Sequence, residues 1–355
     1  MIHYWLTIVK ILVLRHAQAP VALDATIRRT LGLSTGDWFS ARAIIDAQRT
    51  LDTVFTAQAR DGGAFEFTYS RSVIVDGKPA GVIVVAADLM KYERAWSGLQ
   101  DAVLVTVKQT ALTASAPAIT ALLGRDTPAV FLQNGIPWWY FHGQGNADEG
   151  KRIPELDPGD VLWNTVGPQR AVGGVTSSPC TVVEPGVVKL AGKNGTMVFG
   201  EPDGSMSPRL MAIAELFKAA GLPAEATPRI RDAIWQKLAL NLGSGPLAVL
   251  APVSLAALYA EEACVQARFR IQDEVEAIAA AMGCPVTVSR SIEATRKLPH
   301  VPSIGQDVAA GRKPELEAMF RAPLAMAREK GVATPTLDLL VALCTLKLRA
   351  AGMYP

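Results

Sequence analysis

The sequence predicts an α/β protein in which part of a doubly wound parallel sheet is followed by an all-helical C-terminal domain. After Asp101, an apolar run, a helical pattern and a second apolar run follow one another with short links. That order is typical of parallel strands joined by a crossover helix. After Pro208, apolar residues recur at helical spacing up to the last residues. The two patterns together predict a sheet domain and then a helical domain.

The sheet domain is predicted from a strand at 102–107, a helix at 109–123 and a second strand at 129–133. Gly124 stops the helix, because glycine favours the backbone conformation found just after helix ends. The chain then becomes rich in glycine and proline, and short β-type runs predict a meander that finishes the sheet. These runs are 171–176, 180–183, 187–190 and 196–199.

Helical periodicity dominates the C-terminal third, which predicts an all-helical domain. We therefore divide the chain into an atypical N-terminal α/β segment over 1–100, a sheet domain over 101–204 and a helical domain over 205–355. The predicted helices are 210–220, 229–250, 255–282, 315–330 and 337–350.

The N-terminal segment shows a different pattern. Two β-type runs, 65–75 and 81–86, flank the turn sequence Asp76-Gly77, which predicts a β-hairpin. A partner helix is expected over 88–99. Residues 65–99 also weakly resemble the membrane-proximal end of the extracytoplasmic domain of dicarboxylate-type sensor kinases.

Composition argues against several classes of protein. The 35 basic and 33 acidic residues give a formal charge of +2, so there is no broad cationic field to hold a nucleic acid. The four cysteines are far apart and lack metal-ligand spacing, which fits a reducing cytoplasm and predicts no metal site. The apolar stretch 1–14 contains Lys10, is too short to span a membrane and shows no cleavage site. We expect a globular cytoplasmic protein without a membrane partner.

A lysine and an asparagine on one predicted helix carry the candidate chemistry. Lys237 and Asn241 lie four residues apart in the string Ile-Trp-Gln-Lys-Leu-Ala-Leu-Asn, so both point to one side of a helix. A lysine so placed can give a proton to the alkoxide that forms when hydride attacks a ketone, and burial would lower its pKa toward the working range. The alternative is a surface lysine beside an asparagine that packs between helices. Taken alone, the pair fits that alternative better.

Further strings lie on both sides of this pair. Upstream, Val-Thr-Val-Lys ends at Lys108, and the turn Gln-Asn-Gly contains Asn134. Downstream, Ser-Ile-Gly-Gln-Asp begins at Ser303, and Gly-Arg-Lys-Pro-Glu ends at Glu315. In this order and spacing the strings resemble those of the ketopantoate reductases (2-dehydropantoate 2-reductases), over about residues 101–355. A helix cap and a solvated first-turn acid are the alternatives for Ser303 and Glu315.

The resemblance implies a fold and a reaction. The fold is a Rossmann-like NADP domain, here partial, followed by a helical substrate and dimerisation domain like the C-terminal domain of 6-phosphogluconate dehydrogenase. The reaction is the NADPH-dependent reduction of 2-dehydropantoate, a small-molecule 2-oxo acid, to pantoate in pantothenate biosynthesis. No metal takes part. The oligomeric state stays open, with a homodimer as one state that the resemblance allows.

The resemblance also implies roles for the matching residues. Lys237 would be the general acid, and Glu315 a second catalytic residue that binds the substrate hydroxyl. The substrate would also be bound by Asn134, Asn241 and Ser303, with Ser303 at its carboxylate. The residues in contact with the cofactor would be Lys108, Asn134 and Glu315.

Other positions in these strings are expected to serve the structure. Asp307 is expected to order its loop, and the aromatic residues 138–141 to pack in the interior. His142 is expected to be a hydrogen-bonded turn histidine. At Gly245 the sequence departs from the family, many members of which carry an asparagine there, so one substrate hydrogen bond is not expected.

The glycine-rich loop of a dinucleotide-binding domain is missing from the N-terminal segment. Such a loop follows the first strand, because glycines let the backbone approach the pyrophosphate at a helix N-terminus. The run 9–14 would serve as that strand, but Arg15 to Pro20 contains no glycine, and no GxG precedes Asp101. We therefore expect weak NADPH binding and little reduction.

Two alternatives stay open for the whole chain. One is a non-catalytic or recombined chain with a sensor-like N-terminus. The other is a histidine phosphatase with His16 as nucleophile, since Arg15-His16-Ala17-Gln18 follows an apolar strand.

Overall fold

The structure of the chain is a computed structural model. By their contacts the residues form two compact units. The sheet unit comprises Met1–Gln133 and Asp160–Pro228, and the helical unit comprises Asn134–Gly159 and Arg229–Pro355. The predicted division into three domains stays a prediction. The structure describes residues 11–14, 53–58, 64–75, 78–86, 102–177, 180–184, 187–190, 195–219 and 222–355.

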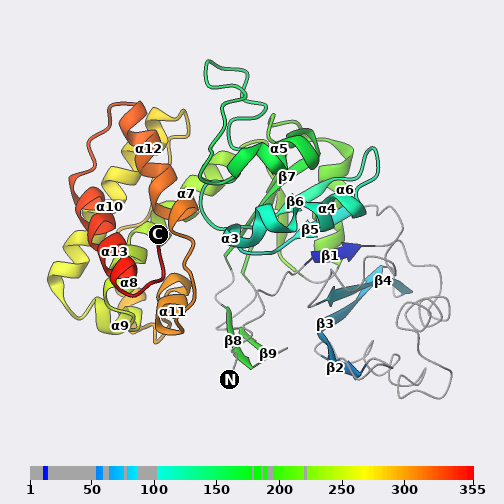
Figure 1. The fold of residues 1–355 in the computed structure, drawn as a ribbon, viewed down its shortest axis with the longest axis horizontal. Coiled ribbons are helices and arrows are strands. Elements are labelled where there is room, and N and C mark those ends of the chain that lie inside the picture. The colour runs from blue at the N-terminus through cyan, green and yellow to red at the C-terminus, as the bar shows by residue number, and fades with distance from the viewer. Residues whose placement is uncertain are drawn as a thin grey trace. The chain divides into compact units, whose positions relative to one another are not determined.

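The sheet unit is built on a nine-stranded sheet with the order β11-β10-β7-β6-β5-β1-β4-β3-β2 (Figure 1). Its strands are β1 (Ile11–Leu14), β2 (Thr53–Gln58), β3 (Ala64–Val75), β4 (Lys78–Ala86), β5 (Ala102–Val105), β6 (Ala129–Phe131), β7 (Ala171–Thr176), β10 (Met197–Gly200) and β11 (Ala224–Ala226). The helical elements of this unit are α3 (Gln109–Leu112), η2 (Thr113–Ser115), α4 (Ala116–Leu122), α5 (Val161–Thr165), η4 (Pro168–Arg170) and α6 (Pro208–Ala219), with the turn η3 (Pro158–Asp160) before α5.

Both faces of the sheet are covered at strand β5, as in a doubly wound domain. Strands β5, β6 and β7 run parallel, which confirms the predicted strand, helix, strand order. Val103 and Val105 point away from the face that Leu104 occupies, because side chains alternate along a strand. All three are buried, and burial on both faces is typical of a parallel sheet between helices.

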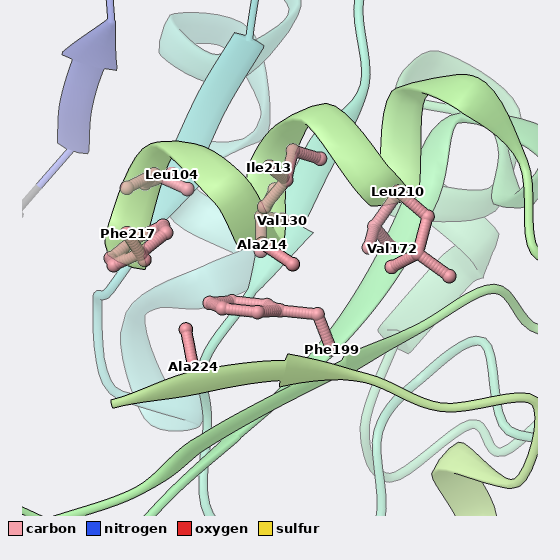
Figure 2. Close-up of a cluster of buried hydrophobic side chains, with 9 residues drawn as sticks. All are labelled: Leu104, Val130, Val172, Phe199, Leu210, Ile213, Ala214, Phe217 and Ala224. Atoms are coloured by element: carbon pink, nitrogen blue, oxygen red, sulfur yellow. The ribbon is translucent and has the colours of Figure 1, made fainter. Parts of the chain in front are cut away.

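Figure 2 shows the face that is covered by α6. The rings of Phe199 and Phe217 lie 4.9 Å apart, so the strand β10 and the helix are in direct contact. Helix α6 therefore packs on the sheet rather than in the helical unit. The buried side chains drawn in Figure 2 are Leu104, Val130, Val172, Phe199, Leu210, Ile213, Ala214, Phe217 and Ala224.

The predicted meander is confirmed in its strands but wrong in its pairing. Strand β7 pairs directly with β10, antiparallel, and with β6 on its other side. Both edges of β7 are thus occupied, so the strand β8 (Cys180–Glu184) does not pair with it, and neither β8 nor β9 (Val187–Leu190) joins the large sheet. They pair with each other in a separate two-stranded sheet.

The N-terminal strands extend the sheet in the antiparallel direction. The predicted hairpin is confirmed: β3 and β4 pair with Val75 opposite Lys78. Strand β1 lies between β4 and β5 and runs antiparallel to both. Its last residue, Leu14, is opposite Ala102, the first residue of β5.

This direction overturns one prediction. The first strand of a dinucleotide-binding unit runs parallel to its neighbour and ends at the carboxyl edge of the sheet. Strand β1 ends instead at the edge where β5 begins. The run 9–14 is thus confirmed as a strand but is not the first strand of such a unit. The predicted helix over 88–99 and the phosphatase-like string at Arg15 to Gln18 lie outside the described residues.

The helical unit confirms the predicted helices with interruptions (Figure 1). The predicted helix 229–250 breaks after Gly243, the helix 255–282 breaks before Glu262, and the helix 315–330 contains a π-helical turn. No described helix combines the length and the apolar character that a membrane crossing needs. The elements are α7 (Ile230–Leu242), α8 (Gly245–Leu250), α9 (Leu255–Leu258), α10 (Glu262–Ala281), η5 (Thr295–Lys297), α11 (Ser303–Ala309), the π turn η6 (Glu317–Arg321), α12 (Ala322–Glu329) and α13 (Pro335–Ala350).

Candidate functional site

Helix α7 carries the predicted pair of polar residues. Ile234, Trp235 and Leu238 are buried and fix one side of the helix in the core of the helical unit. Lys237 and Asn241 lie one turn apart and are half-buried. The side chain of Lys237 is therefore neither fully exposed nor fully enclosed. A catalytic lysine needs this partial burial, whereas the alternative predicted a surface lysine.

The segment after β6 is tied to α7. Trp235 donates from Nε1 to the hydroxyl of Tyr140 at 2.7 Å. Arg231 donates to the carbonyl of Tyr140 at 2.9 Å and to that of His142 at 2.6 Å. The aromatic residues 138–141 are buried, which confirms that they pack in the interior. Arg231 and Trp235 were not predicted as supports, because only the fold brings this segment against the helix.

These supports place the amide of Asn134 beside Lys237. The lysine Nζ donates to Asn134 Oδ1 at 2.6 Å. Glu315, with 8% of its surface exposed, is the charged group that acts electrostatically on this amine. Burial lowers the pKa of Lys237 to about 8, and the negative charge of Glu315 opposes that shift. The structure thus brings together Asn134, Lys237 and Glu315.

The turn between Asn134 and the aromatic segment rests on the π-helical turn η6. Gly135 has a φ of +83°, and a Cβ built there would lie 2.4 Å from the carbonyl oxygen of Ala318. The next residue, Ile136, donates its N–H to that carbonyl at 2.9 Å. A predicted continuous helix over 315–330 overlooked this turn, although Pro323 inside the pattern was a signal for an irregularity.

The two remaining predicted substrate residues do not join this hydrogen-bonded group. Asn241 follows Lys237 by one turn of α7, and Ser303 is the exposed first residue of α11 and makes no side-chain cap. The helix-cap alternative for Ser303 is therefore wrong. Asp307 is buried and pairs with Arg312 at 2.8 Å, which confirms its expected part in ordering the loop that leads to Glu315.

Lys108 belongs to the sheet unit, where it is exposed just beyond the carboxyl end of β5. Gln133 secures this edge, because its Nε2 donates to the carbonyls of Val105 at 2.9 Å and Val107 at 3.0 Å. The carboxyl edge of a parallel sheet is where a dinucleotide binds. Lys108 lies at this edge, and its contact with the charged side of a cofactor stays a prediction.

The pyrophosphate of a dinucleotide fits the described residues less well. It binds where a first parallel strand leads into a helix N-terminus at the carboxyl edge. Strand β1 reaches Leu14 level with Ala102, at the opposite edge. The described part of the sheet unit therefore offers contacts to one side of a dinucleotide and no cradle of this kind for its pyrophosphate.

Comparison with known proteins identifies the family. Residues 229–347 match the C-terminal description of ketopantoate reductase PanE/ApbA, and residues 70–204 match the ketopantoate reductase PanE/ApbA description. A 2-dehydropantoate 2-reductase of Mesorhizobium japonicum is 37% identical over 261 residues, which cover 72% of this chain and 79% of that protein. The chain belongs to the ketopantoate reductase family.

Solved structures agree with this ketopantoate reductase membership. A crystal structure assigned as a ketopantoate reductase of Ralstonia solanacearum MolK2 has a TM-score of 0.67 and 30% identity, covering 80% of this chain and 86% of that one. D-mandelate dehydrogenase in complex with NADH and anilino(oxo)acetate shares the fold, with a TM-score of 0.60 at 22% identity, covering 72% and 78%.

The family is one of NAD(P)-dependent oxidoreductases, and the chain is a member with a Rossmann-like sheet and a helical C-terminal region. The roles assigned to single residues stay predictions, as does the sensor-kinase resemblance of residues 65–99.

Proposed function

We propose that the protein reduces 2-dehydropantoate to pantoate with NADPH, a step of pantothenate biosynthesis, and that Lys237 is the general acid. The observation that carries this proposal is the half-buried amine of Lys237, which donates to Asn134 and is electrostatically coupled to Glu315. The relatives named 2-dehydropantoate 2-reductase support the choice of substrate.

The amine of Lys237 is suited to giving up a proton. With a pKa of about 8, it is mostly protonated at neutral pH, yet it gives up its proton more readily than an ordinary lysine. Reduction turns the ketone oxygen into an alkoxide, and the proton from Nζ completes the hydroxyl. The hydride for such a reduction comes from a reduced nicotinamide.

Asn134 has a second part in this proposal. Its Oδ1 accepts from Lys237, so its Nδ2 group remains a donor for an oxygen of the substrate or cofactor. Glu315 is a buried carboxylate that accepts from the substrate hydroxyl, while Asn241 and Ser303 bind the remainder of the 2-oxo acid. Lys108 contacts the charged side of the cofactor from the sheet unit.

The direct test is to supply millimolar NADPH together with 2-dehydropantoate and to identify pantoate by mass spectrometry. We expect pantoate to form only when both are present. If no pantoate forms at millimolar NADPH, the chain is not a reductase of this substrate. A cytoplasmic location and a homodimer complete the proposal, and size-exclusion chromatography with light scattering checks the latter.

A second candidate function is favoured by the direction of β1. A chain that keeps the substrate site but does not bind NADPH would be a non-catalytic binding protein. It would bind pantoate or 2-dehydropantoate in calorimetry, yet form no product at any NADPH concentration.

A further inference from the structure

The π-helical turn η6 has an unusual hydrogen-bonding pattern. The N–H of Ala322 donates to the carbonyl of Glu317, five residues earlier. If the π pattern continued, the next carbonyl, that of Ala318, would accept a hydrogen bond from the N–H of residue 323. Residue 323 is a proline, which has no N–H to give.

The carbonyl of Ala318 finds its donor outside the helix. Ile136 donates to it at 2.9 Å, and Ile136 is itself buried. The approach is close, since a Cβ at Gly135 would lie 2.4 Å from the same oxygen. Only glycine can occupy that position with the observed φ of +83° and this contact.

The turn lies between two of the groups in the candidate site. Asn134 immediately precedes Gly135 and holds Lys237 at 2.6 Å. Glu315 precedes the first residue of η6 by two positions. A shift of the turn would therefore move the Asn134 loop and the segment that carries Glu315 together.

We propose that Pro323 and Gly135 are positioning residues of the reduction. Pro323 keeps the turn wide and its Ala318 carbonyl available, and this carbonyl fixes the Gly135 loop so that Asn134 meets Lys237. The inference rests on the proposed function for its effect on turnover. Its effect on the loop and on Lys237 holds for the chain regardless of the substrate.

The first test is Pro323→Ala, which gives residue 323 an N–H that competes with Ile136 for Ala318. We expect the amide of Ile136 to exchange with deuterium at least roughly tenfold faster, since it loses or shares its acceptor. Pro335→Ala is the matched control, because Pro335 also lies in the first turn of a helix of this unit. The control should leave the exchange of Ile136 unchanged.

The second measurement follows the titration of Lys237 by NMR with labelled lysine. A displaced Asn134 no longer accepts from the charged amine, so Pro323→Ala should move the titration to lower pH. A purely structural part for the proline would change the melting temperature and leave this titration in place. Turnover of 2-dehydropantoate should fall roughly ten- to a hundredfold, as expected for a misplaced catalytic group.

Gly135→Ala provides an independent route to the same displacement. Its Cβ cannot coexist with the Ala318 carbonyl, so the loop must move, and its defect should not add to that of Pro323→Ala. Folded Pro323→Ala protein with unchanged Ile136 exchange and unchanged Lys237 titration would overturn the inference. A wild type that makes no pantoate would refute the proposed function alone, because the exchange and the titration still report on positioning.

Discussion

The proton-donating site around Lys237 and the sheet that would bind the cofactor are built very differently in this chain. In the helical unit, Lys237 on α7 donates to Asn134 and is electrostatically coupled to Glu315. In the sheet unit, β1 runs antiparallel to β5 where a dinucleotide-binding unit has a parallel first strand. The match to the ketopantoate reductase description that spans residues 70–204 also begins within β3.

Proton donation and cofactor binding are separable in this chain. The acid depends on contacts inside the helical unit, between Asn134, Lys237 and Glu315. The binding of a pyrophosphate depends on the first strand of the sheet and on the helix that follows it. A chain can therefore keep the proton donor while its pyrophosphate-binding region departs from that of the family. Each of the following predictions tests one side of this contrast.

The largest effect is expected from Lys237→Ala. Turnover of 2-dehydropantoate should fall by roughly two to four decades, the usual worth of a positioned proton donor. Lys218→Ala is a suitable control, because Lys218 is exposed on α6 of the sheet unit and forms an ion pair with Glu215 of the same helix. Steady-state kinetics at saturating substrate provide the measurement. Equal turnover in the two variants would remove Lys237 from the mechanism.

The second prediction concerns NADPH. Each hydrogen bond from the backbone to a phosphate is worth about 1.5–3 kcal/mol, and losing two or three that overlap weakens binding by about 3–4 kcal/mol. That is a factor of roughly several hundred, so we expect a dissociation constant near millimolar instead of micromolar.

Calorimetry with NADPH and with reduced nicotinamide mononucleotide sharpens this prediction. The mononucleotide lacks the pyrophosphate and adenosine half, so the two affinities should be similar here. A low-micromolar dissociation constant for NADPH would mean that other residues bind the pyrophosphate. It would contradict the inference that the sheet unit lacks a pyrophosphate site.

The third prediction concerns pH. Lys237 must be protonated to act as the acid, so turnover should be level below its pKa of about 8 and fall about tenfold per pH unit above it. The charge of Glu315 holds this pKa up, so Glu315→Gln should move the falling limb to lower pH. Glu329→Gln, at an exposed ion pair with Lys151, should leave it in place. A limb that stays fixed in Glu315→Gln would contradict the coupling.

The smallest effect is expected at Gly245, where the family resemblance leads us to expect an asparagine. A Cβ there would lie 3.1 Å from the ring of Phe320, so Gly245→Asn should destabilise the fold by about 1–3 kcal/mol without improving kcat/KM. Ala263→Asn is the control, because Ala263 is exposed in the first turn of α10. Thermal unfolding and steady-state kinetics provide the measurements. A stable Gly245→Asn variant with better kcat/KM would show that the ring makes room for the family's amide.

Local patterns were sufficient to predict much of the fold. The apolar runs gave β5, β6 and β7 because a buried parallel strand leaves a short uninterrupted apolar signature. The turn sequence Asp76-Gly77 predicted the pairing of β3 with β4. Pairing between distant strands carries no comparable local signature, which is why the separation of β8 and β9 and the direction of β1 were not predicted.

The candidate site shows the same limit. Lys237 and Asn241 could be placed on one side of a helix from their spacing alone, and the structure confirms this. The meeting of Lys237 with Asn134 joins residues far apart in the sequence, and it depends on Arg231 and Trp235, which look like ordinary helix residues. The π turn was signalled by Pro323, but its contact with Gly135 is a property of the folded chain.

The segment Asn134–Gly159 has a consequence for how the chain is made. It is translated before the sheet unit is complete, yet it packs with helices that begin at Arg229. Because domains fold in the order of their synthesis, the sheet can form while this segment still waits for α7. During that interval Tyr140 lacks its contact with Trp235 of α7. A chain cut after Pro228 would lack this contact permanently, and the complementary fragment would begin without Asn134. The two units are therefore not divisible into two independently expressible halves.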